Sequence, residues 1–353
     1  MAATNSTFRK ILKHPLGLIG SIVIGICIVI SLLGYLMVPD KTPNANDINL
    51  PLASLKPGTT ITYFETIPPP EKSFWDTYTG KTETGERTPI NRYTIKGDTA
   101  FLELYNTDAT TVLKEQKILN NGYYKIVERK FLLGSDNLGR DMFSRLILGT
   151  RISLSVGVVS VVLSLFIGTL MGLLAGYFRG FADTSISWLM NVIWSLPTML
   201  LVAAISFAMG KGFWQIFIAI GISSWVEVAR VIRGQVFSLR EKEYIQAAKV
   251  LGFGSWRIMF RHLLPNLKST LIVLAVANFG SAILLEAGLS FLGLGVSPPA
   301  PSWGLMITEY NSKIMSTTTA YMAIVPGLAI MLLVVAFNFV GTALRDALDI
   351  NIK

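Results

Sequence analysis

The sequence predicts an all-α polytopic membrane protein with about six transmembrane helices and one extracytoplasmic, β-prone insertion. Three observations predict this fold class. Of the 353 residues, 51% are hydrophobic and only 15% are charged, whereas soluble proteins carry roughly 25% charged residues. The charged residues gather in residues 41–130, which hold 12 basic and 11 acidic side chains. The rest of the chain contains apolar runs long enough to cross a hydrocarbon core of about 30 Å.

The first apolar run is Leu16–Val38, which follows a basic N-terminal tail, residues 1–15. As a helix, this run would be about 35 Å long, enough to span the membrane. A signal peptide also begins with basic residues, but its apolar region is about 7–15 residues long and precedes a small-residue cleavage site. The run is longer than that and lacks such a site, so we expect an uncleaved transmembrane helix over residues 16–38.

Five further spans are expected in residues 136–353, which we interpret as the transmembrane core. They are Ile152–Gly176, Ser185–Met209, Phe213–Ile232, Thr270–Leu294 and Ala320–Leu344. Pro197 is expected to kink the second of these, and Glu227 and Arg230 are expected to mark the end of the third. Before the first, residues 140–147 predict a short amphipathic helix that either lies on the membrane surface or orients the span.

The distribution of basic residues predicts the orientation, because lysine and arginine are enriched on the cytoplasmic side of membrane spans. With a cytoplasmic N-terminus, the cytoplasmic segments hold 14 basic residues, and the outer segments hold six when the insertion beyond Lys41 is excluded. We therefore expect a multi-pass protein whose N-terminus and C-terminus are both cytoplasmic. Residues 39–135 are then extracytoplasmic.

This insertion, residues 39–135, has the composition of a β-rich segment. Threonine accounts for 15 of residues 41–130, and alternating runs such as Thr60–Phe64 and Tyr93–Lys96 favour strands. Pro68–Pro70 and the glycines at 80 and 85 mark turns. A small β-rich subdomain and a partly ordered loop both fit this pattern, and the sequence indicates no ligand for it.

Several kinds of chemistry find no support in the sequence. Cys27 is the single cysteine, so no intrachain disulfide can form. His14 and His262 are far apart, and no Cys/His cluster indicates a metal site. No G-x-x-x-x-G-K-[ST] phosphate-binding loop occurs, so we expect no ATP hydrolysis by this chain alone. The net charge of +9 lies mostly beside the apolar spans, which indicates a membrane surface rather than nucleic acid.

The most informative segment is the predicted cytoplasmic loop over residues 233–268. Its pattern predicts two short helices joined at residues 252–255, where Gly252 and Gly254 permit a tight turn, and Pro265 is expected to end the second helix. That helix carries an apolar stripe and a separate basic face, made respectively by Trp256, Met259, Phe260 and Leu263 and by Arg257 and Arg261. An amphipathic helix on the inner leaflet is one interpretation.

A resemblance favours a second interpretation. The segment resembles the cytoplasmic "EAA" loop in the membrane subunits of ABC importers, where Glu-Ala-Ala, a glycine and a terminal Leu-Pro recur at fixed spacing. The matching residues are Ala247, Ala248, Gly252, Leu264 and Pro265, whereas Gln246 replaces the glutamate. The resemblance implies coupling helices that dock on an ATPase subunit, and we assign Glu243, Arg257 and Arg261 to the same coupling site.

Other motifs resemble the C-type subunit of the dipeptide/oligopeptide/nickel branch of these permeases. They are Arg261–Asn266, Leu133–Asp141, Gly149–Leu154, Ser224–Arg230, Glu286–Gly295, Pro301–Gly304 and Pro326–Asp349. The resemblance covers residues 8–38 and 131–350 and leaves the insertion outside. It implies a type I ABC importer fold, in which this chain forms half of the pathway for peptides or related small solutes such as nickel complexes.

The same resemblance implies the partners and the location. We expect a second, different permease subunit, two ATPase subunits that bind ATP and Mg, an extracytoplasmic solute-binding protein and membrane lipid. No cofactor is expected in this chain, and no nucleic acid partner. The resemblance implies the bacterial cytoplasmic (inner) membrane.

Five residues in the predicted spans are candidates for the translocation pathway or for helix packing: Glu286, Asn338, Pro197, Gly168 and Gly172. Glu286 is the only acid well inside a span; it either faces a water-filled pathway or a basic group, or lies near the outer membrane surface. Asn338 needs a hydrogen-bonding partner. Gly168 and Gly172, with Gly176, form a small-residue face that permits close helix contact.

Two other functions remain open from the sequence. A membrane-anchored sensor would use residues 41–135 as its ligand-binding domain and the cytoplasmic loop to engage a regulator. A stand-alone channel is the weaker alternative, because the spans show no ring of charges and no run of filter carbonyls.

Overall fold

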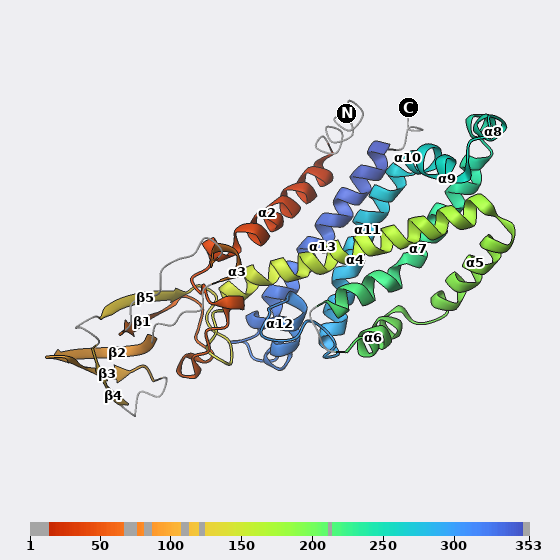
Figure 1. The fold of residues 1–353 in the computed structure, drawn as a ribbon. Coiled ribbons are helices and arrows are strands. Elements are labelled where there is room, and N and C mark those ends of the chain that lie inside the picture. The colour runs from red at the N-terminus through yellow and green to blue at the C-terminus, as the bar shows by residue number, and fades with distance from the viewer. Residues whose placement is uncertain are drawn as a thin grey trace. The chain divides into compact units, whose positions relative to one another are not determined.

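In the computed structural model, the chain is mostly helical, and the structure describes residues 14–66, 76–80, 87–106, 113–119, 124–210 and 214–348 (Figure 1). Most of the predicted N-terminal tail (residues 1–13) and the turns predicted at Pro68–Pro70 and Gly85 lie outside these ranges. The chain forms two compact units. One comprises residues 1–27, 153–297 and 327–353, and the other comprises residues 28–152 and 298–326.

Five helices are long and apolar enough to cross a membrane. They are α2 (Pro15–Met37), α4 (Met142–Phe178), α7 (Gln215–Arg240), α11 (Lys268–Phe291) and α13 (Tyr321–Leu348). A sixth candidate is the pair α5 (Gly180–Trp194) and α6 (Thr198–Ala208), whose axes are bent by 95°. The predicted helical membrane fold is therefore confirmed.

The packing of α4 against α7 indicates that the bent pair crosses the membrane. A Cβ added at Gly168 would lie 2.5 Å from the Cβ of Val228. Eight residues later, a Cβ added at Gly176 would lie 2.7 Å from the Cβ of Val236. The contacting positions advance by eight residues in each helix, from Gly168 to Gly176 in α4 and from Val228 to Val236 in α7. The two helices therefore run in the same direction. The chain between them must return to the side on which α4 begins, so α5 and α6 form a broken span, and the total of six agrees with the sequence prediction.

Pro197 lies at the break in this span. It is the residue before α6, with φ −58° and ψ 121°, and its carbonyl accepts a hydrogen bond from the Leu201 amide at 3.0 Å. Proline has no N–H to donate to a preceding turn but is well suited to the start of a helix. The chain therefore breaks between α5 and α6, which is a sharper change than the predicted kink.

Of the two alternatives for residues 140–147, the separate surface helix is wrong. Helix α4 begins at Met142 and continues without interruption to Phe178. Arg140 and Arg145 are buried rather than exposed on an amphipathic surface. The two arginines find acidic partners inside the protein, so this segment extends α4 instead of lying on the membrane.

Helix α7 continues eight residues beyond the predicted end of its span, to Arg240. The two arginines near that predicted end are accommodated by neighbouring side chains. The Arg230 guanidinium lies 3.6 Å from the centroid of the Trp194 ring, and Arg233 Nη2 donates to Asp183 Oδ2 at 2.7 Å. The first residues of the predicted cytoplasmic loop therefore belong to α7.

The insertion contains a five-stranded antiparallel sheet (Figure 1). Its strands are β1 (Thr59–Glu65), β2 (Arg87–Lys96), β3 (Thr99–Leu104), β4 (Lys114–Ile118) and β5 (Lys125–Phe131), in the order β4-β3-β2-β1-β5. The two alternating runs singled out in the sequence lie in β1 and β2, so the prediction of a β-rich subdomain is confirmed. Thr59, the first residue of β1, pairs with Phe131, the last residue of β5. The chain therefore enters and leaves the sheet at neighbouring positions. A short helix, α3 (Asp76–Thr79), lies between β1 and β2.

The glycine face of α4 generates a test of the packing. A Cβ at Gly172 would lie 2.7 Å from the Ala229 carbonyl oxygen and 2.8 Å from the Cβ of Ile232. We expect Gly172→Leu to destabilise the protein by about 1–3 kcal/mol, because overpacked contacts force backbone shifts. Its midpoint of thermal unfolding in mild detergent should fall. Gly25→Leu is the matched control, because nothing lies within 4 Å of a Cβ at Gly25 in α2; equal midpoints for the two variants would contradict the close contact.

Candidate functional site

The predicted coupling segment connects α7 to α11 through four short elements. They are α8 (Glu243–Val250), α9 (Ser255–Ile258), the π-helical turn η4 (Met259–Leu263) and α10 (Leu264–Asn266). The last three follow one another directly, so the segment is in effect two helices joined at residues 251–254. This arrangement has the predicted turn in the predicted place.

The turn depends on one of its two glycines. Gly252 has φ +75°, its amide donates to the Lys249 carbonyl at 3.0 Å, and the Phe253 amide donates to the Ala248 carbonyl at 3.1 Å. These two bonds are the Schellman arrangement that ends a helix at a left-handed residue. Gly254 has φ −62° and ψ 149°, which any residue adopts. Only Gly252 is therefore required by the backbone.

Pro265 does not end the second helix, contrary to the prediction. It lies within α10, directly after the π-helical turn. The Leu264 amide donates to the Met259 carbonyl, five residues earlier. A proline in a helix removes one hydrogen bond and crowds the preceding turn. The wider π-helical turn accommodates it, and the chain leaves the helix only at Leu267.

The inner side of the segment is built into a hydrophobic core with α4 and α7. The buried residues of this core are Leu173 and Tyr177 from α4, Val228, Ile232 and Val236 from α7, and Ile245, Ala248, Ile258, Met259, Leu263 and Leu267 from the segment and its junction with α11. Leu264 packs against it in part. Each fully buried aliphatic side chain contributes about 1.5–3 kcal/mol, so the segment is held firmly to the two helices.

The outer side of the segment exposes large apolar side chains. The predicted stripe divides: Met259 and Leu263 are buried, whereas Trp256 and Phe260 are exposed and stack with their ring centroids 5.7 Å apart. Tyr244, Val250 and Leu251 are also exposed, and Val250 retains 88% of its accessible surface. Exposed apolar groups of this size mark interaction surfaces.

The remaining predicted coupling residues lie around this surface. Gln246 Nε2 donates to the Arg240 carbonyl at 2.9 Å and so caps the end of α7. Ala247 is exposed and Ala248 is buried, so the alanine pair lies between the two sides. Glu243 is in the first turn of α8, where a negative charge is favourable.

Both arginines of the second helix are exposed. The Arg257 guanidinium lies 4.3 Å from the centroid of the Phe253 ring. Arg261 is on the same exposed surface, in the π-helical turn. The structure therefore brings the predicted coupling residues to one connected segment.

The candidates within the spans are placed differently from one another. Glu286 in α11 is fully buried and accepts a hydrogen bond from Ser290 Oγ at 2.8 Å; the structure thus places it inside the protein. Gly168 and Gly172 lie against α7. Asn338 in α13 has an exposed side chain, and within the described ranges the only hydrogen bond that involves this residue outside the helix backbone is Thr342 Oγ1 to the Asn338 carbonyl. The partner expected for its amide is not found there.

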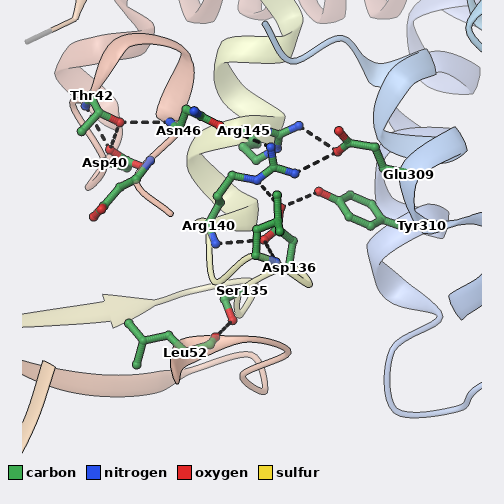
Figure 2. A network of polar contacts seen from close by, with 12 residues as sticks. Asp40, Thr42, Asn46, Leu52, Ser135, Asp136, Arg140, Arg145, Glu309 and Tyr310 are labelled. Atoms are coloured by element: carbon green, nitrogen blue, oxygen red, sulfur yellow. Dashed lines mark hydrogen bonds and ion pairs between the residues drawn. The ribbon is translucent and has the colours of Figure 1, made fainter. Parts of the chain in front are cut away.

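A buried polar network lies at the start of α4, where the insertion rejoins the helix (Figure 2). Asp136 Oδ2 accepts hydrogen bonds from Arg140 Nε at 2.6 Å and from the Tyr310 hydroxyl at 2.9 Å. Glu309 Oε2 accepts from Arg140 Nη2 at 3.1 Å and from Arg145 Nη2 at 2.9 Å. Glu309 and Tyr310 belong to α12 (Trp303–Tyr310), so the network joins α12 to the first turn of α4.

The same network holds the first residues of the insertion. Arg140 Nη1 donates to Asn46 Oδ1 at 3.3 Å, and Ser135 Oγ donates to the Leu52 carbonyl (Figure 2). The Leu55 amide donates to Ser135 Oγ at 2.9 Å. The segment that leads into β1 is therefore tied by side chains to the residues just before α4.

Burial dominates the electrostatics of this network. Arg145 is completely buried, and its Nε and Nη1 atoms have no hydrogen-bond partner among the described residues. Burial raises the pKa of the Asp141 carboxyl, against the lowering effect of its hydrogen bond from Ser144. Burial also raises the pKa of the Tyr310 hydroxyl well above its ordinary value. Among the described residues, Glu309 is the only carboxylate within salt-bridge distance of Arg145, at 2.9 Å.

Sequence reasoning singled out Arg140 and Arg145 but missed Glu309 and Tyr310. Two features of the sequence could have suggested the pair. Glu309 is the one acid in the apolar segment Trp303–Tyr310, and two arginines lie beside the apolar run of the second span. Pairing them needs tertiary information, because they are separated by 164 residues or more.

The network generates a stability prediction. We expect Glu309→Ala to destabilise the protein by about 3 kcal/mol or more, because it leaves a buried arginine without its counter-charge. Thermal unfolding in mild detergent measures the effect, with Glu128→Ala, an exposed acid in β5, as the control. The double variant Arg145→Met/Glu309→Leu should recover most of the loss, since apolar replacements remove both charges. A midpoint for Glu309→Ala no lower than that of Glu128→Ala would contradict the role of this ion pair.

Comparison with known proteins identifies the family. The family model described as "Binding-protein-dependent transport system inner membrane component" matches residues 168–353, more than half of the chain. The chain is 44% identical over 221 residues to the glutathione transport system permease protein GsiD of Pectobacterium atrosepticum, covering 63% of this chain and 73% of that protein. It is 42% identical over 220 residues to the dipeptide transport system permease protein DppC of Alkalihalophilus pseudofirmus, covering 62% and 72%.

A chain of the methionine ABC transporter MetNI, solved in an inward facing conformation, is similar over 57% of this chain and 97% of that one, with 19% identity and a TM-score of 0.46. The family match over residues 168–353 includes the coupling segment and the later spans α7, α11 and α13. The protein is therefore a member of the family of binding-protein-dependent transport system inner membrane components.

Proposed function

We propose that this chain is one transmembrane subunit of an ATP-driven importer for peptides or chemically related small solutes. It forms half of the translocation pathway together with a second, different permease subunit. Two separate ATPase subunits bind ATP and Mg, and an extracytoplasmic solute-binding protein delivers the substrate. The named relatives that carry glutathione or dipeptides support the substrate class.

The observation that carries the proposal is the two-sided construction of residues 243–266. One side is buried in a core shared with α4 and α7, and the other exposes Tyr244, Leu251, Trp256 and Phe260. A partner that moves the exposed side must therefore move α4 and α7 as well, because packed cores shift as units rather than deform. ATP binding drives transport only if the ATP-bound partners favour one access state over the other.

The sensor hypothesis is not supported, because the relatives reported above are transport permeases. Within the importer, we propose that Asn338, exposed on α13, faces the second permease or the pathway, where its amide would find a partner. Glu286 has its hydrogen bond with Ser290 inside the protein, which favours a packing role for it over direct contact with substrate.

We further propose that the coupling segment and both chain ends lie in the cytoplasm. Six spans place the two ends on the same side, and His14 Nε2 lies 3.9 Å from Asp346 Oδ2. The excess of basic residues in the segments assigned to the cytoplasm supports this orientation.

Cysteine labelling tests the broken span and the orientation together. After Cys27→Ala, single cysteines are placed on either side of α5 and α6 by Phe181→Cys and Met209→Cys, both exposed positions. An impermeant maleimide should label residue 209 in intact spheroplasts and residue 181 only after permeabilisation. Labelling of both from one side would contradict six spans, and the reverse pattern would contradict the orientation.

The turn at Gly252 tests the coupling. Valine at φ +75° is strained by about 1–2 kcal/mol or more, so Gly252→Val should deform the Schellman turn and reduce substrate-stimulated ATP hydrolysis and transport by the reconstituted complex. Gly254→Val is the matched control, since φ −62° and ψ 149° suit valine and nothing lies within 4 Å of a Cβ there.

Both variants should insert in the membrane. If Gly252→Val copurified with its ATPase subunits and transported as well as Gly254→Val, the assignment of this segment to coupling would be wrong.

A further inference from the structure

Three basic side chains from different parts of the chain meet where α4 ends. We call Arg179, Arg240 and Lys249 the inner basic cluster. The Arg240 guanidinium lies 5.7 Å from the centroid of the Tyr177 ring, and Lys249 Nζ lies 5.8 Å from the same centroid. Arg179 follows Tyr177 by two residues. Arg240 and Lys249 therefore share the Tyr177 ring, and Arg179 is close enough to Lys249 to lower the pKa of its ammonium.

The charges in this cluster are only partly balanced. Arg179 Nη2 donates to Glu241 Oε1 at 2.6 Å, and Arg240 Nη1 donates to the Tyr177 carbonyl at 2.6 Å. Lys249 forms no salt bridge with any described residue. The neighbouring Arg233–Asp183 pair adds no net charge, so the three cations and Glu241 leave an excess of two positive charges. Burial lowers the pKa of Lys249, and the nearby Arg240 lowers it further. An anion bound between these groups would relieve their mutual repulsion.

The backbone at Arg179 has a conformation that is unusual for a residue other than glycine. Arg179 has φ 56° and ψ −166°, close to a region that is essentially restricted to glycine and that costs another residue about 1–3 kcal/mol. In this conformation its guanidinium lies 5.3 Å from the centroid of the Phe237 ring. Strain of this kind persists where the surrounding structure requires the residue, and it gathers at ligand sites.

Two exposed aromatic side chains lie directly beside the cluster. Phe178 and Phe181 flank Arg179 in the sequence, and Phe181 retains 88% of its accessible surface. They come immediately after the apolar part of α4, where the helix leaves the hydrocarbon core. Aromatic rings at this depth with basic groups next to them are typical of a membrane interface, and basic pockets between transmembrane helices bind acidic headgroups.

We propose that the inner basic cluster binds a phosphate group, supplied by the headgroup of an anionic phospholipid, with Phe178 and Phe181 against its acyl chains. The chemistry of recognition is charge-assisted hydrogen bonding from two guanidiniums and one ammonium. Only the assignment to the cytoplasmic leaflet rests on the proposed function. Because Lys249 is on α8, a lipid at this site also contacts the coupling segment.

Binding of a short-chain lipid to the purified complex in mild detergent tests the site. Dihexanoyl-phosphatidylglycerol is titrated below its micelle concentration, and dihexanoyl-phosphatidylcholine and inorganic phosphate are titrated in parallel. We expect dihexanoyl-phosphatidylglycerol to bind more tightly than either of the other two compounds. Arg179→Gln and Lys249→Gln should each raise its Kd about fivefold. Lys268→Gln is the matched control, an exposed lysine at the start of α11 on the same side of the membrane, and should leave Kd unchanged.

The outcomes separate the possible sources of the phosphate. Tighter binding of inorganic phosphate at the same residues would overturn the lipid assignment, and equal phosphatidylglycerol Kd values in the native protein and both variants would overturn the site. Thermal unfolding of each variant shows whether it is folded. If Arg179→Gln does not fold, Lys249→Gln, which changes a side chain of α8, still tests the site. The measurement involves no transport, so a chain that copurified without ATPase subunits would contradict the proposed function and not this site.

Discussion

The contact between α4 and α7 is the constraint on which the rest of the transmembrane unit depends. Three glycines on α4, at positions 168, 172 and 176, bring its backbone against Val228, Ile232 and Val236 of α7. Helices in a membrane gain no hydrophobic driving force from meeting each other, so close van der Waals contact through small residues must hold them. The contact fixes the two helices as parallel, which requires α5 and α6 to cross, and it aligns their ends to receive the coupling segment.

Charged groups are placed where this helical frame can satisfy them. At the start of α4, two arginines share Glu309, and Arg145 is completely buried. At its other end, Arg233 pairs with Asp183 while Arg179, Arg240 and Lys249 exceed the single acid beside them. A buried ion pair gives little net stability but is costly to break, so the first set specifies structure. The unbalanced second set is suited to an anion from outside the chain.

The sequence by itself determined the class of the protein and most of its helices. Exposing long apolar runs to water is unfavourable, so they are placed in lipid. There, a helix is the structure that pairs every backbone N–H and C=O group within one segment. Threonine-rich alternation predicted the sheet of the insertion, since such residues fit a pleated surface. The EAA-like motif marked residues 243–266 and its two glycines located the turn, although the structure needs only Gly252 at positive φ.

Only the tertiary structure decided which residues face one another. The stripe of Trp256, Met259, Phe260 and Leu263 is uniform in sequence, yet two members are buried against α4 and α7 and two are exposed, because the orientation of a short helix is set by its neighbours. From the sequence, residues 140–147 fitted a surface helix as well as a segment that orients the next span, because their partner, Glu309, is far along the chain. Helical periodicity reports what lies on each face of one segment; the partner of that face comes from another segment, and packing alone selects it.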